Sequence, residues 1–91
     1  MLEKVRAALR ITVRAYDEEL ERLISAAQLD LGVAGVVIPE EMDALVETAV
    51  ITYCRLQFGS PADYDRLKRS YDEQKAQLSM HTGHTSWEVG D

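Results

Sequence analysis

Apolar residues recur at every third or fourth position through four stretches of the chain, and this period most constrains its fold. Residues at this spacing share one face of an α-helix. The chain is therefore predicted to be all-α, a small bundle of about four helices with a flexible C-terminal tail. The periodic positions are Leu2, Val5 and Leu9; Leu20, Leu23, Ile24, Ala27 and Leu31; Met42, Leu45, Val46, Ala49, Val50, Tyr53 and Leu56; and Tyr64, Leu67, Tyr71 and Leu78.

Turn and capping residues place the ends of the first two helices. The first is expected to end near residue 10, because three β-branched residues follow it. The second is expected over about residues 15–31, with Asp17 as its N-cap and with Gly32 and Gly35 as its stop. The apolar linker at residues 36–38 is expected to lie against the core.

Proline and glycine delimit the other two helices. Pro39 suits a first helical turn and Gly59 suits a stop, so a central, most apolar helix is expected over about residues 39–58. Ser60 is expected to cap a fourth helix that ends near Leu78.

The helical period stops at the end of this fourth stretch. Residues 1–79 are therefore expected to form one helical domain, and residues 80–91 a flexible tail. Trp87 stands in this tail, and a tryptophan buries a large area when it finds a pocket. Trp87 is predicted to dock on a partner protein; folding back onto its own domain is the alternative.

Charge is segregated along the chain, whose net charge is −6. The first sixteen residues hold four basic residues and one acid, whereas residues 17–48 hold nine acids and one base. Opposite patches on different sides of a subunit favour head-to-tail contacts, which close into rings when the rotation fits. Solvated helix faces are the alternative. The predicted subunit interface comprises Lys4, Arg6, Arg10, Arg14, Asp17, Glu18, Glu21, Glu40 and Glu41.

No residue pattern predicts catalysis, and the chain is expected not to be an enzyme. The acids gather at helix starts, and no phosphate loop, nucleophile elbow or zinc-binding helix motif is present. Cys54 has no histidine placed to pair with it, and His81 and His84 supply too few ligands for a metal site. We expect no catalytic residue, cofactor or metal. Apolar runs, such as residues 36–38, are no longer than three residues, which predicts no membrane span, and the start of the chain, residues 1–4, lacks the apolar stretch of a signal peptide.

Four segments follow one another in an order typical of one protein family. Residues 2–12 read Leu-Glu-Lys-Val-Arg-Ala-Ala-Leu-Arg-Ile-Thr, and residues 16–20 read Tyr-Asp-Glu-Glu-Leu. An apolar helix then ends in an aromatic residue and glycine at residues 58–59, and Ser-Tyr-Asp-Glu-Gln-Lys-Ala-Gln-Leu-Ser follows at residues 70–79. Across residues 2–79 the chain resembles the head–tail connector, or adaptor and DNA-packaging, proteins of long-tailed bacteriophages.

The resemblance implies a structural protein of the virion, made in the cytoplasm of the bacterial host. Such proteins form a homo-oligomeric ring of about a dozen copies below the portal protein. The ring extends the DNA channel, with DNA only as passing cargo, and docks a tail or stopper protein. No catalytic residue is carried over from the family.

Two other classes of protein stay open on the sequence. One is a small helical protein–protein interaction module or regulator of bacterial origin. The other is a helix-turn-helix DNA binder, which would need a basic recognition helix. The third helix offers only Arg55 for that purpose.

Overall fold

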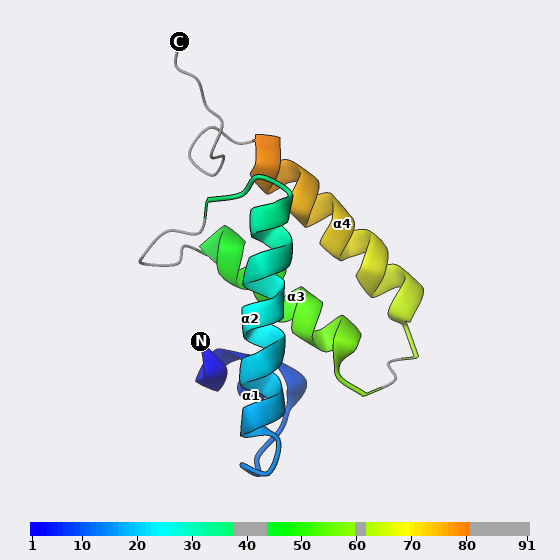
Figure 1. The fold of residues 1–91 in the computed structure, drawn as a ribbon. Helices are drawn as coiled ribbons and strands as arrows, with labels where there is room; N and C mark the ends of the chain where they lie inside the picture. The colour runs from blue at the N-terminus through cyan, green and yellow to red at the C-terminus, as the bar shows by residue number, and fades with distance from the viewer. Residues whose placement is uncertain (38–43, 60–61, 81–91) are drawn as a thin grey trace.

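The computed structural model describes residues 1–37, 44–59 and 62–80, which form four helices (Figure 1). These are α1 (Leu2–Leu9), α2 (Asp17–Val33), α3 (Ala44–Gln57) and α4 (Tyr64–Met80). The all-α fold predicted from the apolar period is confirmed. The helix starts expected at Pro39 and Ser60 lie outside the described residues, as does the expected tail apart from Met80, which belongs to α4. Within the described ranges no helix is long and apolar enough to cross a membrane.

The end of α1 falls where the β-branched run predicts it. Arg10 adopts a left-handed conformation, with φ 59° and ψ 39°, and its N–H donates to the carbonyl of Ala7 at 3.1 Å. The N–H of Ile11 donates to the carbonyl of Arg6 at 2.9 Å. These two bonds pair carbonyls that a helix end would otherwise leave free. The chain therefore turns sharply after α1, which packs against both α2 and α3.

The start of α2 differs from the prediction by one residue. Tyr16, not Asp17, is the N-cap, and the carbonyl of Tyr16 accepts the N–H of Leu20 at 2.9 Å. The Asp17 carboxylate makes no capping bond and faces Arg6 and Arg14 across the turn. Asp17 still lies in the first turn, where a negative charge stabilises the positive end of the helix dipole.

The end of α2 lies at Val33, beyond the predicted Leu31. Of the two predicted stop glycines, Gly32 was wrong, whereas Gly35 is confirmed by the turn after the helix. The helix continues through Gly32 to Val33, and the chain turns at Gly35, whose φ is 94°. A glycine inside a helix costs about 1 kcal/mol relative to alanine, which does not end a helix held by packing. Leu31, one residue before Gly32, is fully buried and supplies that packing.

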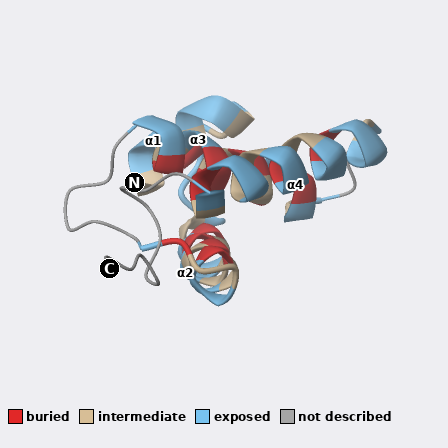
Figure 2. Cartoon of the chain, turned by 90° about the horizontal axis from the view of Figure 1, so that it is seen from above, coloured by how far each residue is buried: buried red, intermediate tan, exposed pale blue. Residues whose placement is uncertain are grey.

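The helices form two layers (Figure 2). In the view from above, α2 lies by itself on one side with its buried residues turned toward α3, and α1, α3 and α4 form the other side. α3 packs against both α2 and α4, as expected for the central helix. The core of buried residues consists of Val5, Leu20, Ile24, Ala27, Leu31, Val36, Val46, Ala49, Val50, Cys54, Leu56, Leu67, Tyr71 and Leu78.

A few residues predicted to be buried are exposed. Leu45 is 56% exposed and Tyr64 is 43% exposed, although both continue an apolar stripe. Each lies in the first turn that is described for its helix, where neighbouring helices cover less of it. In the linker, Val36 is buried as expected, but Val37 is 41% exposed.

Candidate interaction surfaces

Part of the predicted interface makes ion pairs inside one chain. Lys4 Nζ lies 2.8 Å from Glu47 Oε2. Arg6 and Arg14 both face Asp17, with nitrogen–oxygen distances of 3.7 and 3.8 Å. Arg6 is the most enclosed of these bases, with 12% of its side chain exposed. The structure therefore brings the basic first segment against the acidic middle segment within a subunit.

The other predicted interface residues remain available or lie elsewhere. Arg10, Glu18 and Glu21 are exposed and form no ion pair with another residue of the described ranges. Glu40, Glu41 and the predicted docking residue Trp87 lie outside the described residues. The role of these residues between subunits stays a prediction.

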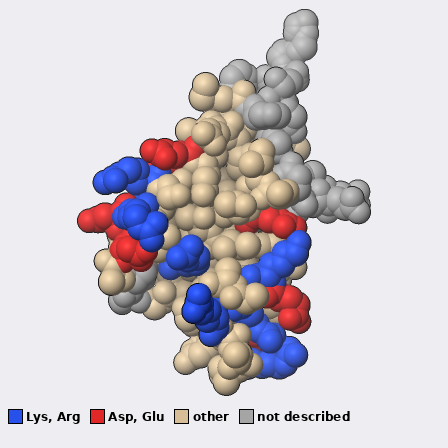
Figure 3. Space-filling model, turned by 180° about the vertical axis from the view of Figure 1, so that it is seen from behind, with Lys and Arg blue, Asp and Glu red and all other residues tan. Residues whose placement is uncertain are grey.

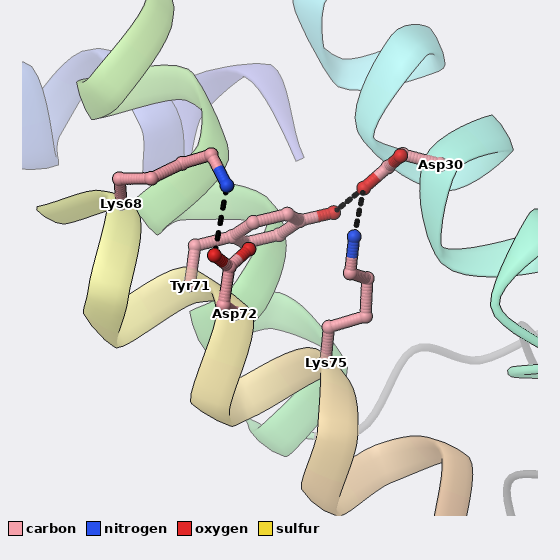
Figure 4. A network of polar contacts seen from close by, with 5 residues as sticks. All are labelled: Asp30, Lys68, Tyr71, Asp72 and Lys75. Atoms are coloured by element: carbon pink, nitrogen blue, oxygen red, sulfur yellow. Dashed lines mark hydrogen bonds and ion pairs between the residues drawn. The ribbon is translucent and has the colours of Figure 1, made fainter.

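A polar network joins the two layers at one carboxylate (Figure 4). Asp30 on α2 accepts a hydrogen bond from the Tyr71 hydroxyl at 2.6 Å and another from Lys75 Nζ at 3.1 Å. Lys75 Nζ also lies 5.2 Å from the centroid of the Tyr71 ring, and the Tyr53 ring packs edge-on against Tyr71 at 5.3 Å. On the far side of Tyr71, Lys68 pairs with Asp72 at 2.8 Å.

The electrostatics of this network suit a structural clamp. Partial burial by itself would raise the pKa of Asp30, but the hydrogen bonds from Tyr71 and Lys75 outweigh it and hold that pKa below its ordinary value. Burial, followed by the bond to Asp30, raises the pKa of Tyr71. Asp30 therefore stays ionised and Tyr71 stays protonated near neutral pH, so neither is poised to exchange a proton.

Sequence reasoning missed Asp30, although the fourth apolar stripe has a gap that Asp30 explains. The stripe of α4 has polar residues, Gln74 and Lys75, where another apolar residue would continue it. In the structure, Lys75 lies at this gap and its Nζ donates a hydrogen bond to Asp30. The available signal was Tyr71 followed four residues later by Lys75, a pair that shares one helix face.

The buried thiol of Cys54 is a core residue. Burial raises the pKa of this thiol to about 11, so it is a poor nucleophile near neutral pH. The described parts of the chain contain no group of three or more histidine, cysteine, aspartate and glutamate side chains that could hold a metal ion. His81 and His84 lie outside these parts.

An apolar groove lies between the start of α3 and the end of α4. It has a volume of about 410 Å³ and contains Leu45 and Met80, which are 56% and 82% exposed. We call it the α3–α4 groove; it is lined by Leu45, Thr48, Gln74, Gln77, Leu78 and Met80.

A second depression lies where α1, α3 and α4 meet. Arg10 and Arg55 both line it, and Asp63, which also lines it, pairs with Arg66. Arg10 and Arg55 therefore leave it with unpaired positive charge among the described residues, and we call it the basic depression. Its remaining lining residues are Ala8, Leu9, Phe58 and Leu67.

The outward side of α2 carries apolar residues that no described element covers. Leu29 is 72% exposed and Val33 is 89% exposed, four residues apart and so on one face. Earlier on this helix, Glu18 and Glu21 are exposed. We call these four residues the outer α2 face. Its first half is acidic apart from Arg22, and its second half is apolar.

Comparison with known proteins gives one match. The model of the phage connector protein family matches residues 1–85, which is nearly the whole chain. No curated protein and no solved structure matches. Together with the helical fold and its exposed apolar and charged surfaces, this match shows that the chain belongs to the phage connector protein family.

Proposed function

We propose that this chain is a head–tail connector, or head-completion adaptor, of a tailed phage or prophage. In this role it forms a ring below the portal at the head–tail junction of the virion. The ring extends the DNA channel and docks tail or stopper proteins. The observation that carries the proposal is the family match over residues 1–85.

The features of the molecule support an assembly role. Its exposed surfaces include an apolar groove and an unpartnered apolar helix face, as expected of a chain that binds other proteins. The polar network at Asp30 fixes the fold and offers no tuned acid or base. A structural family of this kind also favours a protein that is not an enzyme.

Removing the gene from the phage or prophage that encodes it tests the proposal. DNA-containing heads and free tails should then accumulate without joining, and supplying the protein in trans should restore tailed particles. Electron microscopy and mass spectrometry of purified virions provide the two readouts. Tailed, infectious particles made without the protein would contradict the proposal.

The partner-docking role of Trp87 is a separate part of this proposal. The residue belongs to the tail beyond α4, and a tryptophan supplies more contact area than other side chains. The variant Trp87→Ala should therefore lose binding to the purified portal protein while keeping its helical circular dichroism spectrum. Unchanged portal binding would remove Trp87 from the docking surface.

A further inference from the structure

The two layers of the fold turn different surfaces to solvent. Leu29 follows the buried Leu20 by nine residues, which places it about half a turn around α2, directly opposite the core. The outer α2 face therefore points away from α1, α3 and α4 (Figure 2). The α3–α4 groove and the basic depression are lined by those three helices and the segment leading into α4, with no residue from α2. A protruding apolar surface and a hollow one thus belong to opposite layers.

Charged and apolar regions follow the same order on both layers. On the outer α2 face, the acids Glu18 and Glu21 lie at the end near α1 together with one exposed base, Arg22, and Leu29 and Val33 lie at the other end. On the opposite layer, the basic depression includes residues of α1, whereas the groove reaches the end of α4. Seen from behind, basic side chains lie across the lower half of that layer, with acidic side chains beside them toward both edges, and the surface above them is uncharged except at its edges (Figure 3).

We propose that copies of this chain associate front to back, with the outer α2 face of one copy packed on the α3–α4 groove and basic depression of the next. Leu29 and Val33 enter the groove, and Glu18 and Glu21 meet Arg10 and Arg55. This assignment rests on the proposed ring and names the surfaces that build it. A cavity of about 150 Å³ holds a benzene-sized molecule, so the groove of about 410 Å³ has room for two aliphatic side chains.

The placement of the two surfaces fits a closed ring. A contact between different surfaces of identical copies is heterologous, and it closes into a ring when the rotation between copies divides a full turn. For about a dozen copies the rotation is roughly 30°, so the two contact surfaces must lie on nearly opposite sides of a subunit. An isologous dimer would instead use one surface twice.

Cysteine crosslinking tests the contact even where association is weak. Single variants Val33→Cys and Met80→Cys place thiols on the two exposed surfaces, and Cys54 is buried and out of reach. When the two single variants are combined and oxidised, the main product should be a disulfide between one copy of each variant. A chain that carries both cysteines should form a ladder of covalent oligomers. Val13→Cys paired with Met80→Cys is the control, because Val13 is 54% exposed and outside both surfaces. A yield no higher than that of the control would overturn the proposal.

A mixing experiment separates a heterologous contact from an isologous one. The variant Leu29→Glu/Val33→Glu keeps the groove, and Leu45→Glu/Met80→Glu keeps the outer α2 face. Each variant alone should self-associate at least about a hundredfold more weakly than the wild type. Their mixture should form 1:1 dimers that do not grow, as measured by sedimentation velocity, and the control Val13→Glu should behave as wild type. Absence of that heterodimer would contradict the head-to-tail assignment.

Locating the protein in purified virions distinguishes failure of this interface from failure of the proposed function. If the crosslinks are absent but the protein is found at the head–tail junction, the connector role stands and these surfaces are wrong. If the crosslinked ladder forms but tailed virions lack the protein, the surfaces stand and the connector role is wrong.

Discussion

At the residue scale, Asp30 is the polar side chain on which the contact between α2 and α4 depends. It receives hydrogen bonds from Tyr71 and Lys75, both on α4, while most of α2 packs on α3. The Asp30 carboxylate is 38% exposed, so its bonds compete with water and stabilise the fold modestly. What the network provides is a fixed position of α4 relative to α2, and α4 forms one wall of the groove.

Removing the Tyr71 hydroxyl should therefore have a small, measurable cost. Tyr71→Phe keeps the ring that packs on Tyr53 and deletes only the donor to Asp30. We expect the free energy of unfolding to fall by about 0.5–1.5 kcal/mol, measured by urea denaturation. Tyr64→Phe is the matched control, because Tyr64 is exposed on the same helix. Equal losses in the two variants would argue against a specific role for the Tyr71–Asp30 bond.

The lowered pKa of Asp30 predicts a dependence of stability on pH. Because the folded protein holds this pKa below the ordinary value of 3.8, the unfolded chain binds the proton more readily. The stabilisation is therefore present above about pH 4 and is lost as the pH falls through the lowered value. Unfolding measured from about pH 6 to about pH 2 should lose less stability in Asp30→Asn than in wild type. An unchanged pH profile in Asp30→Asn, compared with the exposed-site control Asp65→Asn, would contradict this prediction.

The sequence could not have identified Asp30 as this centre. An acid in the middle of a helix has the same local pattern whether it faces solvent or a neighbouring helix. Only the packing of both α2 and α4 on α3 brings Asp30 within reach of Tyr71, which lies forty-one positions away in the chain. The basic residues were predicted as a group, but the pairing of Arg6 and Lys4 within the subunit likewise depends on how α1 packs.

At the element scale, α2 has two apolar faces with different roles. Leu20, Ile24, Ala27 and Leu31 are buried on the inner face, while Leu29 and Val33 stand on the outer face. The inner face contributes to folding because it removes apolar surface from water in the monomer. The outer face removes little apolar surface in the monomer, so most of any benefit from its apolar residues must come from association.

A pair of matched substitutions separates these roles. Leu20→Ala should lower the free energy of unfolding by about 2–5 kcal/mol, because it leaves a cavity at a fully buried position. Leu29→Ala, the same chemical change on the same helix, should change it by no more than about 0.5 kcal/mol. Urea denaturation at a protein concentration where the chain is monomeric is the measurement. A large loss from Leu29→Ala would mean that its side chain supports the monomer fold.

The apolar period was enough to predict all four helices, but not their ends. At the start of α2, Asp17 and Tyr16 both precede an apolar stripe; Tyr16 is the cap, while Asp17 faces Arg6 and Arg14. At the end, burial of Leu31 outweighed the weak helix propensity of Gly32. The outer face left a signal that the stripe analysis passed over, namely Leu29 and Val33 four residues apart and off the main stripe.

At the scale of the whole molecule, association would add stability to a domain whose core is modest. A domain of this size buries only about 60–65% of the surface of its unfolded chain, so a partner that binds only the folded state stabilises it by mass action. Front-to-back contacts would give every copy in a closed ring two such partners. The intrachain pairs of Lys4, Arg6 and Arg14 leave Arg10 and Arg55 as the bases available for the contact proposed here.

Charge reversal across the proposed contact gives a prediction for the assembled molecule. Arg10→Glu/Arg55→Glu should weaken self-association by about two- to thirtyfold, because the two exposed ion pairs that it breaks contribute about 0.2–1 kcal/mol each. Glu18→Arg/Glu21→Arg should weaken it similarly. A chain carrying all four changes should recover, since each reversed surface then meets a reversed partner on the next copy. Light scattering at low salt is the measurement, because salt screens these pairs over a Debye length of about 10 Å at 0.1 M. If the chain with all four changes loses as much self-association as the two double variants together, these acids and bases do not meet.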